Sequence, residues 1–154
     1  MKYRPLLPVV VLAALTTGAI PAGAQVLEMS LSPRVITFPS SDPDVVPIVA
    51  AAPITVSYRI RQNSGSPWSM TVLAGGDLIS GPSSVDISNV TWTATPAPPF
   101  QGGTLSKTVA QRIASGTGNV ANPSIGSVTF RLANSWTYST GTYTQTVLFT
   151  LSSP

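Results

Sequence analysis

The stretch "PITVSYRIRQ", residues 53–62, decides the fold class of this 154-residue chain. Its apolar residues Ile54, Val56, Tyr58 and Ile60 alternate with Thr, Ser and Arg. Successive side chains of a β-strand point to opposite faces, so this alternation gathers the apolar residues on one face and the polar residues on the other. The stretch therefore predicts a strand with one face in a core and one in solvent.

Similar alternating runs recur along the chain. "WSMTVLA", residues 68–74, repeats the pattern, and the turn cluster "QNSGSP", residues 62–67, has the length of a hairpin loop, so we expect the two strands to pair. The other expected strands are Leu27–Leu31, Val35–Phe38, Asn89–Ala94, Thr104–Ala114, Ser127–Leu132 and Tyr143–Leu151. Short strands separated by frequent turns predict an all-β fold, an immunoglobulin-like antiparallel β-sandwich of about seven to eight strands.

Residues 104–114 carry two competing patterns. Leu105, Val109 and Ile113 are four residues apart, which is helical spacing. Val109 and Ile113 are also β-branched, and together with Gln111 they fit one face of a strand. The sequence favours a strand here and leaves a helix open.

The N-terminus has the pattern of a secretory signal peptide. Lys2 and Arg4 precede an apolar stretch, residues 6–15, and a small-residue site follows at residues 22–24. We expect cleavage after Ala24, which divides the chain into a signal peptide, residues 1–24, and a single β-sandwich domain, residues 25–154. The apolar stretch is short for a bilayer span, although an uncleaved anchor is the alternative.

No later stretch is long enough to span a membrane, so we expect no membrane span in the mature chain. The expected location is secreted, extracellular or at the cell surface, with passage through the periplasm if the host is Gram-negative. Residues 25–154 hold six basic and five acidic residues, and this small net charge gives no basic patch for nucleic acid. There is no cysteine, so the core rather than disulfides must stabilise the domain.

The sequence offers little for catalysis. It has no His and no Cys, which removes the usual general base, the thiol nucleophile and the preferred transition-metal ligands. Asp77 and Asp86 could meet across a turn as paired carboxylates, although turn formation is the simpler role. Asp42 and Asp44 have a spacing found in calcium loops but lack further acids, so they are assigned to a turn. We expect no enzyme activity, no catalytic residue, no metal and no cofactor.

The aromatic residues divide into two groups. Trp68 and Trp92 are in phase with apolar neighbours and are expected in the core. Trp136 and Tyr138 lie among Asn, Ser and Thr in a loop, which we expect to close a hairpin between the last two strands. Two rings at this spacing could stack on a sugar or anchor a protein; alternatively, Trp136 folds back and caps the sandwich.

Sheet edges are the other candidate for binding. The mature N-terminal segment, residues 25–38, could complete its own sheet or add a strand to the sheet of a neighbour, because open edges present unpaired N–H and C=O groups. Its alternating Leu27, Met29 and Leu31 are the candidate residues for strand pairing with a partner.

The stretches "LSPRVITF", "PWSMTV" and "SWTYSTGTYTQTVLFTLS" resemble, in layout, the immunoglobulin-like or pilin-like domains of exported bacterial surface, fimbrial and adhesin proteins. The resemblance implies a secreted structural or adhesive subunit, fibre-like, that acts through sheet edges and loops without catalysis. Its partner would be a second copy or another surface protein. The alternative is a small carbohydrate-binding module that uses Trp136 and Tyr138 to bind a polysaccharide. The chain lacks the cysteine pair of many fimbrial subunits.

Overall fold

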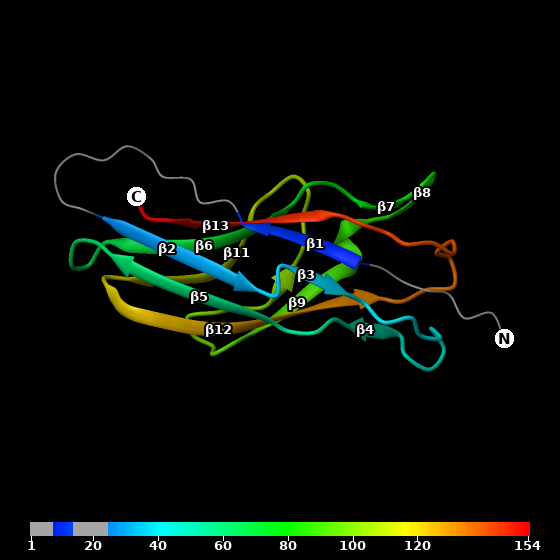
Figure 1. Ribbon diagram of the computed structural model, residues 1–154, viewed down its shortest axis with the longest axis horizontal. Coiled ribbons are helices and arrows are strands. Elements are labelled where there is room, and N and C mark those ends of the chain that lie inside the picture. The colour runs from blue at the N-terminus through cyan, green and yellow to red at the C-terminus, as the bar shows by residue number, and fades with distance from the viewer. Residues whose placement is uncertain (1–7, 14–24) are drawn as a thin grey trace.

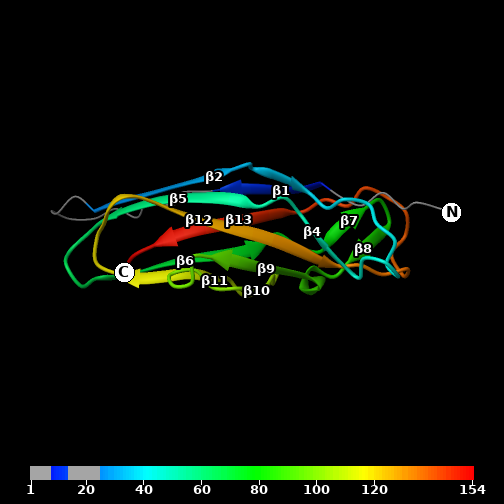
Figure 2. The same ribbon diagram turned by 90° about the horizontal axis from the view of Figure 1, so that it is seen from below.

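The computed structural model describes residues 8–13 and 25–154, which form two packed layers of β-strands (Figure 1). The view from below shows the two layers lying along a common long axis (Figure 2). Within the described residues there is no α-helix; a single 3₁₀ turn, η1, covers Ile87–Asn89. The structure thus confirms the all-β sandwich that the alternation predicts.

Two sheets and a small hairpin account for the strands. Sheet 1 has the order β11 (Gln111–Thr117), β6 (Pro67–Ala74), β13 (Thr146–Ser152), β1 (Pro8–Ala13) and β3 (Val35–Thr37). Sheet 2 has the order β10 (Gly103–Thr104), β9 (Val90–Thr95), β12 (Val120–Ala133), β5 (Ile54–Arg61) and β2 (Val26–Ser32), and β4 (Ile48–Ala50) pairs with β12. The two-stranded hairpin consists of β7 (Leu78–Ser80) and β8 (Ser83–Val85). All pairings are antiparallel except that of β1 with β13, which is parallel.

The core lies between the two sheets, where the alternating strands place their apolar faces. On β5, the four apolar residues of the opening stretch are buried, whereas Thr55 and Arg61 on its other face are exposed. Trp68 and Trp92 are also buried, as expected. Two aromatic pairs join the layers: Tyr58 packs on Trp68 with ring centroids 5.3 Å apart, and Phe130 packs edge-on against Phe149 with centroids 6.4 Å apart.

Two expected hairpins are wrong. β5 and β6 do not pair: β5 lies in sheet 2 between β12 and β2, and β6 lies in sheet 1 between β11 and β13. β12 and β13 also lie in different sheets, so the loop that holds Trp136 crosses from one layer to the other instead of closing a hairpin. The physical reason is that a strand in either sheet of a sandwich buries one face, so alternation identifies the buried face but not the partner strand.

Residues 104–114 are neither a continuous strand nor a helix. β10 ends at Thr104, β11 begins at Gln111, and the residues between them form an irregular loop. Leu105 and Ile113 are buried, but Val109, the middle residue of the apparent helical repeat, is 60% exposed. The spacing of four therefore reflects two separate contacts with the core, and the loop between them faces outward.

Four strands were not expected from the sequence: β1, β4, β7 and β8 lie outside all of the expected ranges. β1, residues 8–13, lies inside the predicted signal peptide and is part of sheet 1 (Figure 1). The rest of that predicted peptide, residues 1–7 and 14–24 with the cleavage site, lies outside the described residues, so cleavage after Ala24 stays a prediction. Among the helices of the described residues, none has the length and apolar character needed to cross a bilayer.

Candidate functional site: a strand slot, a charged pocket and an aromatic loop

β1 lies between β13 and β3 in sheet 1, and we call this position the strand slot. β1 runs parallel to β13, with Val10–Ala13 opposite Thr146–Phe149. On its other side it runs antiparallel to β3, with Pro8–Val10 opposite Thr37–Val35. Nothing else in the described part of the chain links β13 to β3 within this sheet.

The walls of the strand slot are apolar toward the core and polar or exposed toward solvent. Ile36 on β3 and Val147 and Phe149 on β13 are at most 2% exposed with β1 in place. Their outward neighbours differ: Val35 is 51% exposed, and Thr146 is also exposed. A strand in the slot therefore completes the backbone ladder and covers part of the apolar core at the same time.

The other candidate strand edge belongs to β2, which ends sheet 2 and holds the residues expected to pair with a partner. β2 pairs with β5 over all seven of its residues. Met29 and Leu31 are buried in the domain's own core, and Leu27 packs against it. The mature N-terminal segment thus completes its own sheet, and its apolar side chains face inward.

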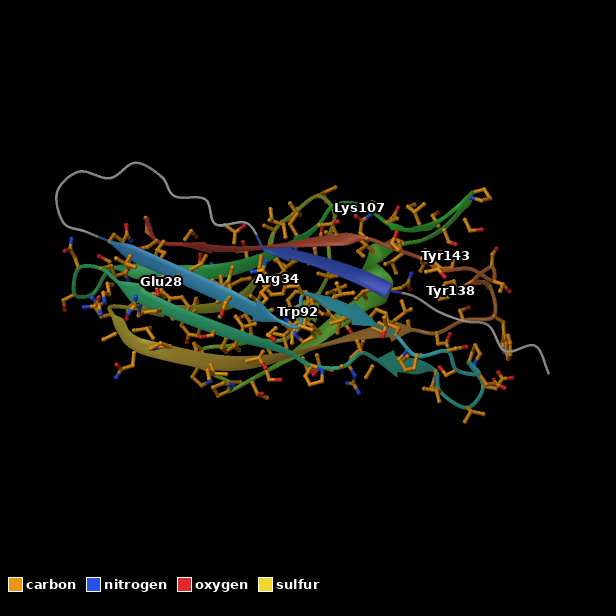
Figure 3. All side chains as sticks on the ribbon, in the orientation of Figure 1. Glu28, Arg34, Trp92, Lys107, Tyr138 and Tyr143 are labelled. Carbon is orange, nitrogen blue, oxygen red and sulfur yellow. The ribbon has the colours of Figure 1, made fainter. Side chains whose placement is uncertain are left out.

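Glu28 and Arg59 form an ion pair across β2 and β5. They lie opposite each other in the ladder, and the Glu28 Oε1 atom is 2.5 Å from an Arg59 guanidinium nitrogen. The hydrogen bond from Arg59 lowers the pKa of Glu28. The Arg59 side chain is 30% exposed and that of Glu28, labelled in Figure 3, is 52% exposed, and such a cross-strand pair on the outer face helps to fix the register of the edge strand.

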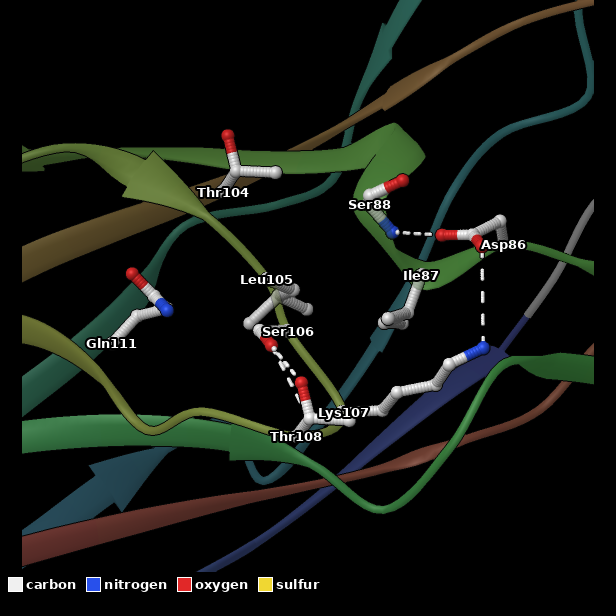
Figure 4. A pocket seen from close by; sticks show the side chains of 9 residues that line it. All are labelled: Asp86, Ile87, Ser88, Thr104, Leu105, Ser106, Lys107, Thr108 and Gln111. Carbon is white, nitrogen blue, oxygen red and sulfur yellow. Dashed lines mark hydrogen bonds and ion pairs between the residues drawn. The ribbon is translucent and has the colours of Figure 1, made fainter.

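A charged pocket lies beside the irregular loop that follows β10. It has a volume of about 340 Å³ and is lined by Asp86, Ile87, Ser88, Thr104, Leu105, Ser106, Lys107, Thr108 and Gln111 (Figure 4). Lys107 Nζ lies 2.6 Å from Asp77 Oδ2 and 4.0 Å from Asp86 Oδ2. The structure thus brings together the two carboxylates that the sequence placed across a turn, but it places a lysine between them.

Asp77 connects several segments around this pocket. Its Oδ1 accepts a hydrogen bond from the Ile87 backbone N–H at 3.1 Å, and its backbone carbonyl accepts one from the Gln145 amide at 2.6 Å. Together with the Lys107 pair, these bonds join the start of the β7–β8 hairpin to η1, to the segment before β13 and to the loop after β10. The cluster has the geometry of a structural clamp.

The electrostatics of the two acids differ from those of a proton-transfer pair. The hydrogen bond from Lys107 lowers the pKa of Asp77, and hydrogen bonds from Ser88 lower the pKa of Asp86. Both carboxylates therefore stay ionised at neutral pH, whereas a general acid needs a raised pKa. The cluster as arranged supports ion pairing and hydrogen bonding rather than acid–base chemistry.

Asp42 and Asp44 form a turn, as expected. Asp42 accepts hydrogen bonds from the Asp44 N–H through its side chain and from the Val45 and Val46 N–H groups through its carbonyl. Within residues 8–13 and 25–154, no three His, Cys, Asp or Glu side chains gather in the way a metal site requires.

The loop between β12 and β13 places its aromatic residues in different environments. Trp136 is 47% exposed, whereas Tyr138 packs against the core and donates a hydrogen bond from its hydroxyl to the Ala133 carbonyl at 3.0 Å. Burial raises the pKa of Tyr138. Tyr143 is buried and donates to the Ser139 carbonyl, and both tyrosines lie at the same end of the molecule (Figure 3). Tyr138 therefore folds back on the sandwich, whereas Trp136 keeps 47% of its surface exposed, so the two rings lie in different environments.

Asn134 ties this loop to the turn before β4. Its backbone N–H donates to the Pro47 carbonyl, and its side-chain amide donates to the carbonyls of Ser41 and Val46. The turn also exposes Val45. The loop end of the sandwich therefore presents Trp136 and a nearby turn, in which the exposed Val45 lies beside two exposed aspartates, on a hydrogen-bonded support.

Sequence reasoning missed the strand slot because the apolar residues 8–13 fit the pattern of a signal peptide. The signal that could have revealed it is "VVV" at residues 9–11, since β-branched residues favour strands over helices. The chain matches no protein-family model and no curated protein. The strand slot, the charged pocket and the aromatic loop are consequently the observations on which a functional proposal can be based.

Proposed function

We propose that the chain is an exported, non-catalytic structural or adhesive subunit that joins other molecules through the strand slot of sheet 1. The observation that carries this proposal is the position of β1. A strand from the predicted signal peptide lies between β13 and β3 and, among the residues that the structure describes, is the only link between them in the sheet. Removal of the leader would leave two unpaired strand edges beside an apolar core, and such edges pair readily with other chains.

Two further observations support a structural role. The buried side chains of the described residues are all apolar, so the core holds no polar centre for chemistry. The acids that converge are ionised and paired with Lys107. The layout of the domain is also similar to the exported immunoglobulin-like and pilin-like surface domains named above, and the proposal places this chain among such surface components.

Size-exclusion chromatography and negative-stain microscopy of the exported, processed chain test the proposal. We expect assemblies larger than a monomer, which return to monomers when a peptide of residues 7–14, flanked by lysines for solubility, is added in excess. Charged residues on exposed edges discourage edge pairing, so Val35→Lys together with Leu148→Lys should reduce assembly. Val109→Lys, at an exposed position outside the slot, is the matched control. A monomer under all conditions, or assembly that the edge lysines leave unchanged, would contradict the proposal.

A carbohydrate-binding module is the second candidate, and the exposure of Trp136 favours it. A single exposed ring can stack on a sugar face, although Tyr138 is committed to the core. Trp136→Ala should then abolish retention of the protein on insoluble polysaccharide while the far-UV circular dichroism spectrum stays unchanged. Retention of the variant equal to that of the parent protein would remove this candidate.

A further inference from the structure

We propose that the charged pocket beside the loop after β10 binds one neutral sugar unit through two adjacent hydroxyl groups. The pocket lies between η1 and the residues that follow β10 (Figure 4), separate from the strand slot and from the loop that holds Trp136. Its volume of about 340 Å³ is at the lower end of the range for small-molecule sites. It therefore fits a single sugar ring rather than an oligosaccharide.

Asp86 and Lys107 form one polar wall of the pocket and leave room between them for a hydroxyl. Lys107 Nζ is 4.0 Å from Asp86 Oδ2, which is an ion-pair distance but too long for a hydrogen bond. Asp77, at 2.6 Å from the same ammonium, anchors the Lys107 side chain. A hydroxyl oxygen can accept a hydrogen bond from the ammonium and donate one to the carboxylate. One sugar hydroxyl therefore bridges the ion pair without separating the two charges.

The second hydroxyl is assigned to two polar groups on the other side of the pocket. The Thr104 hydroxyl and the side-chain oxygen of Gln111 line it, and neither takes part in a hydrogen bond within the described part of the chain. In the view of Figure 4 these groups lie on one side of Leu105, and Lys107 and Asp86 lie on the other. Adjacent hydroxyls on one ring suit this arrangement, because each hydroxyl both donates and accepts.

The pocket is apolar beneath these polar groups, and backbone hydrogen bonds hold its shape. Ile87 and Leu105 line it and are buried. The Leu105 N–H donates to the Val90 carbonyl and the Ala74 N–H donates to the Ser106 carbonyl, each at 2.9 Å. Apolar side chains with a few polar groups around them suit a sugar ring, which has an apolar C–H face and a polar edge. Because the loop is already fixed, binding needs little ordering of the chain.

The charge of the pocket selects against acidic sugars. Hydrogen bonds lower the pKa of Asp77 and of Asp86, so both are ionised at neutral pH, and Lys107 supplies one positive charge. Two negative charges and one positive charge leave this group with a net charge of −1. A carboxylate on the ligand would be repelled. We therefore expect a neutral sugar to bind and a uronic acid to be excluded.

NMR spectroscopy of the amide signals of the exported, processed chain tests this site. The probes are the methyl glycosides of glucose, mannose and galactose, each raised to about 50 mM, because a ligand with so few atoms has an expected Kd of the order of 1 mM. We expect at least one of them to shift the amide signals of Ser88 and of residues 104–108, and to leave those of residues 134–138 unchanged. The methyl glycoside of glucuronic acid should cause no shift. Tetrahydropyran-2-methanol, a ring without adjacent hydroxyls, should also cause none.

Two substitutions test the assigned contacts. Thr104→Val removes one hydrogen bond to the sugar and should weaken binding at least about threefold. Asp86→Asn removes a charged acceptor and should weaken binding at least about tenfold, while its side-chain oxygen can still accept the Ser88 N–H at the start of η1. Thr55→Val and Asp42→Asn are the matched controls, because both positions are exposed and lie outside the pocket. They should bind the sugar as the parent protein does.

The absence of a shift with all three neutral glycosides would overturn the site. Equal or stronger shifts with the glucuronide, or with the ring that lacks adjacent hydroxyls, would overturn the assigned ligand class. Shifts confined to residues 134–138 would assign sugar binding to the Trp136 loop instead. Affinity equal to that of the parent protein in the pocket variants would overturn the contacts, and Thr104→Val alone decides this if Asp86→Asn does not fold. Assembly through the strand slot is measured separately by size-exclusion chromatography, so failure of one proposal leaves the other standing.

Discussion

Two substitutions in β5 test the orientation of the whole sandwich. One replaces a methyl group by a hydroxyl on the buried face, and the other replaces a hydroxyl by a methyl group on the exposed face. Val56 is fully buried in the middle of β5, with Leu31 of β2 and Gly126 of β12 as its register neighbours. Val56→Thr keeps nearly the same shape but adds a hydroxyl. The buried residues around it in the described chain are apolar, so the new hydroxyl finds no side-chain partner. A buried hydroxyl without a partner costs about 1–3 kcal/mol of stability.

The reverse exchange at the adjacent residue is the control. Thr55 is exposed on the opposite face of the same strand, so Thr55→Val changes the unfolding free energy by no more than about 0.5 kcal/mol. Urea denaturation followed by tryptophan fluorescence measures both variants. With a slope of about 2 kcal/mol per molar urea, a loss of about 2 kcal/mol lowers the midpoint by about 1 M for Val56→Thr. Equal shifts for the two variants, or a larger loss for Thr55→Val, would refute the assigned faces.

Three further substitutions and one change of pH test local features. Gly116→Ala should destabilise the protein by about 1–3 kcal/mol, because an added Cβ would lie 2.7 Å from the ring of Trp68. Tyr143→Phe should cost about 0.5–1.5 kcal/mol through loss of its hydroxyl hydrogen bond. Stability should fall on acidification below about pH 4, because the lowered pKa of Asp77 stabilises the fold above its ordinary pKa and this contribution is lost as the pH falls through the folded value. Lys107→Met should flatten that acid dependence, since it removes the main cause of the lowered pKa.

The same denaturant titration checks each of these predictions. Ser115→Ala, next to Gly116 on β11, should have little effect, and a loss equal to that of Gly116→Ala would show that the ring contact is unimportant. If Tyr143→Phe kept full stability, the Ser139 carbonyl would have replaced the lost hydrogen bond with one from solvent. If the stability of Lys107→Met fell with pH as steeply as that of the parent protein, the acid dependence would come from other carboxylates. Glu28, whose pKa is also lowered, would be the first to test.

Alternation in the sequence was sufficient to predict the fold class and most of the buried face. Val147, Phe149 and Leu151 all lie in the core, as the pattern of the last strand indicates. It was not sufficient to predict the pairing, because the turns after β5 and β12 connect the two layers and a short turn can equally close a hairpin. The loop around Val109 was missed because two core contacts, at Leu105 and Ile113, happen to have helical spacing.

The candidate sites were predictable only in part. Asp77 and Asp86 do converge, but the contribution of Lys107, 30 residues from Asp77, depends on a tertiary contact that no local pattern reveals. Trp136 and Tyr138 were treated alike because both lie in a polar loop. Their difference arises from the hydrogen bond of Tyr138 to Ala133 and its packing on the core. The strand slot was hidden because its occupant has the composition of a signal peptide.

Hydrogen exchange of those amides of Thr146–Phe149 that point away from β6, in the exported, processed chain, is the most direct measurement of the central claim, that sheet 1 has an open strand position. The account predicts fast exchange at these amides in the processed chain at concentrations low enough to keep it monomeric. It predicts slow exchange after addition of the peptide of residues 7–14, while β5 stays protected in both states. Slow exchange in the processed monomer without peptide, or no change on adding the peptide, would contradict it.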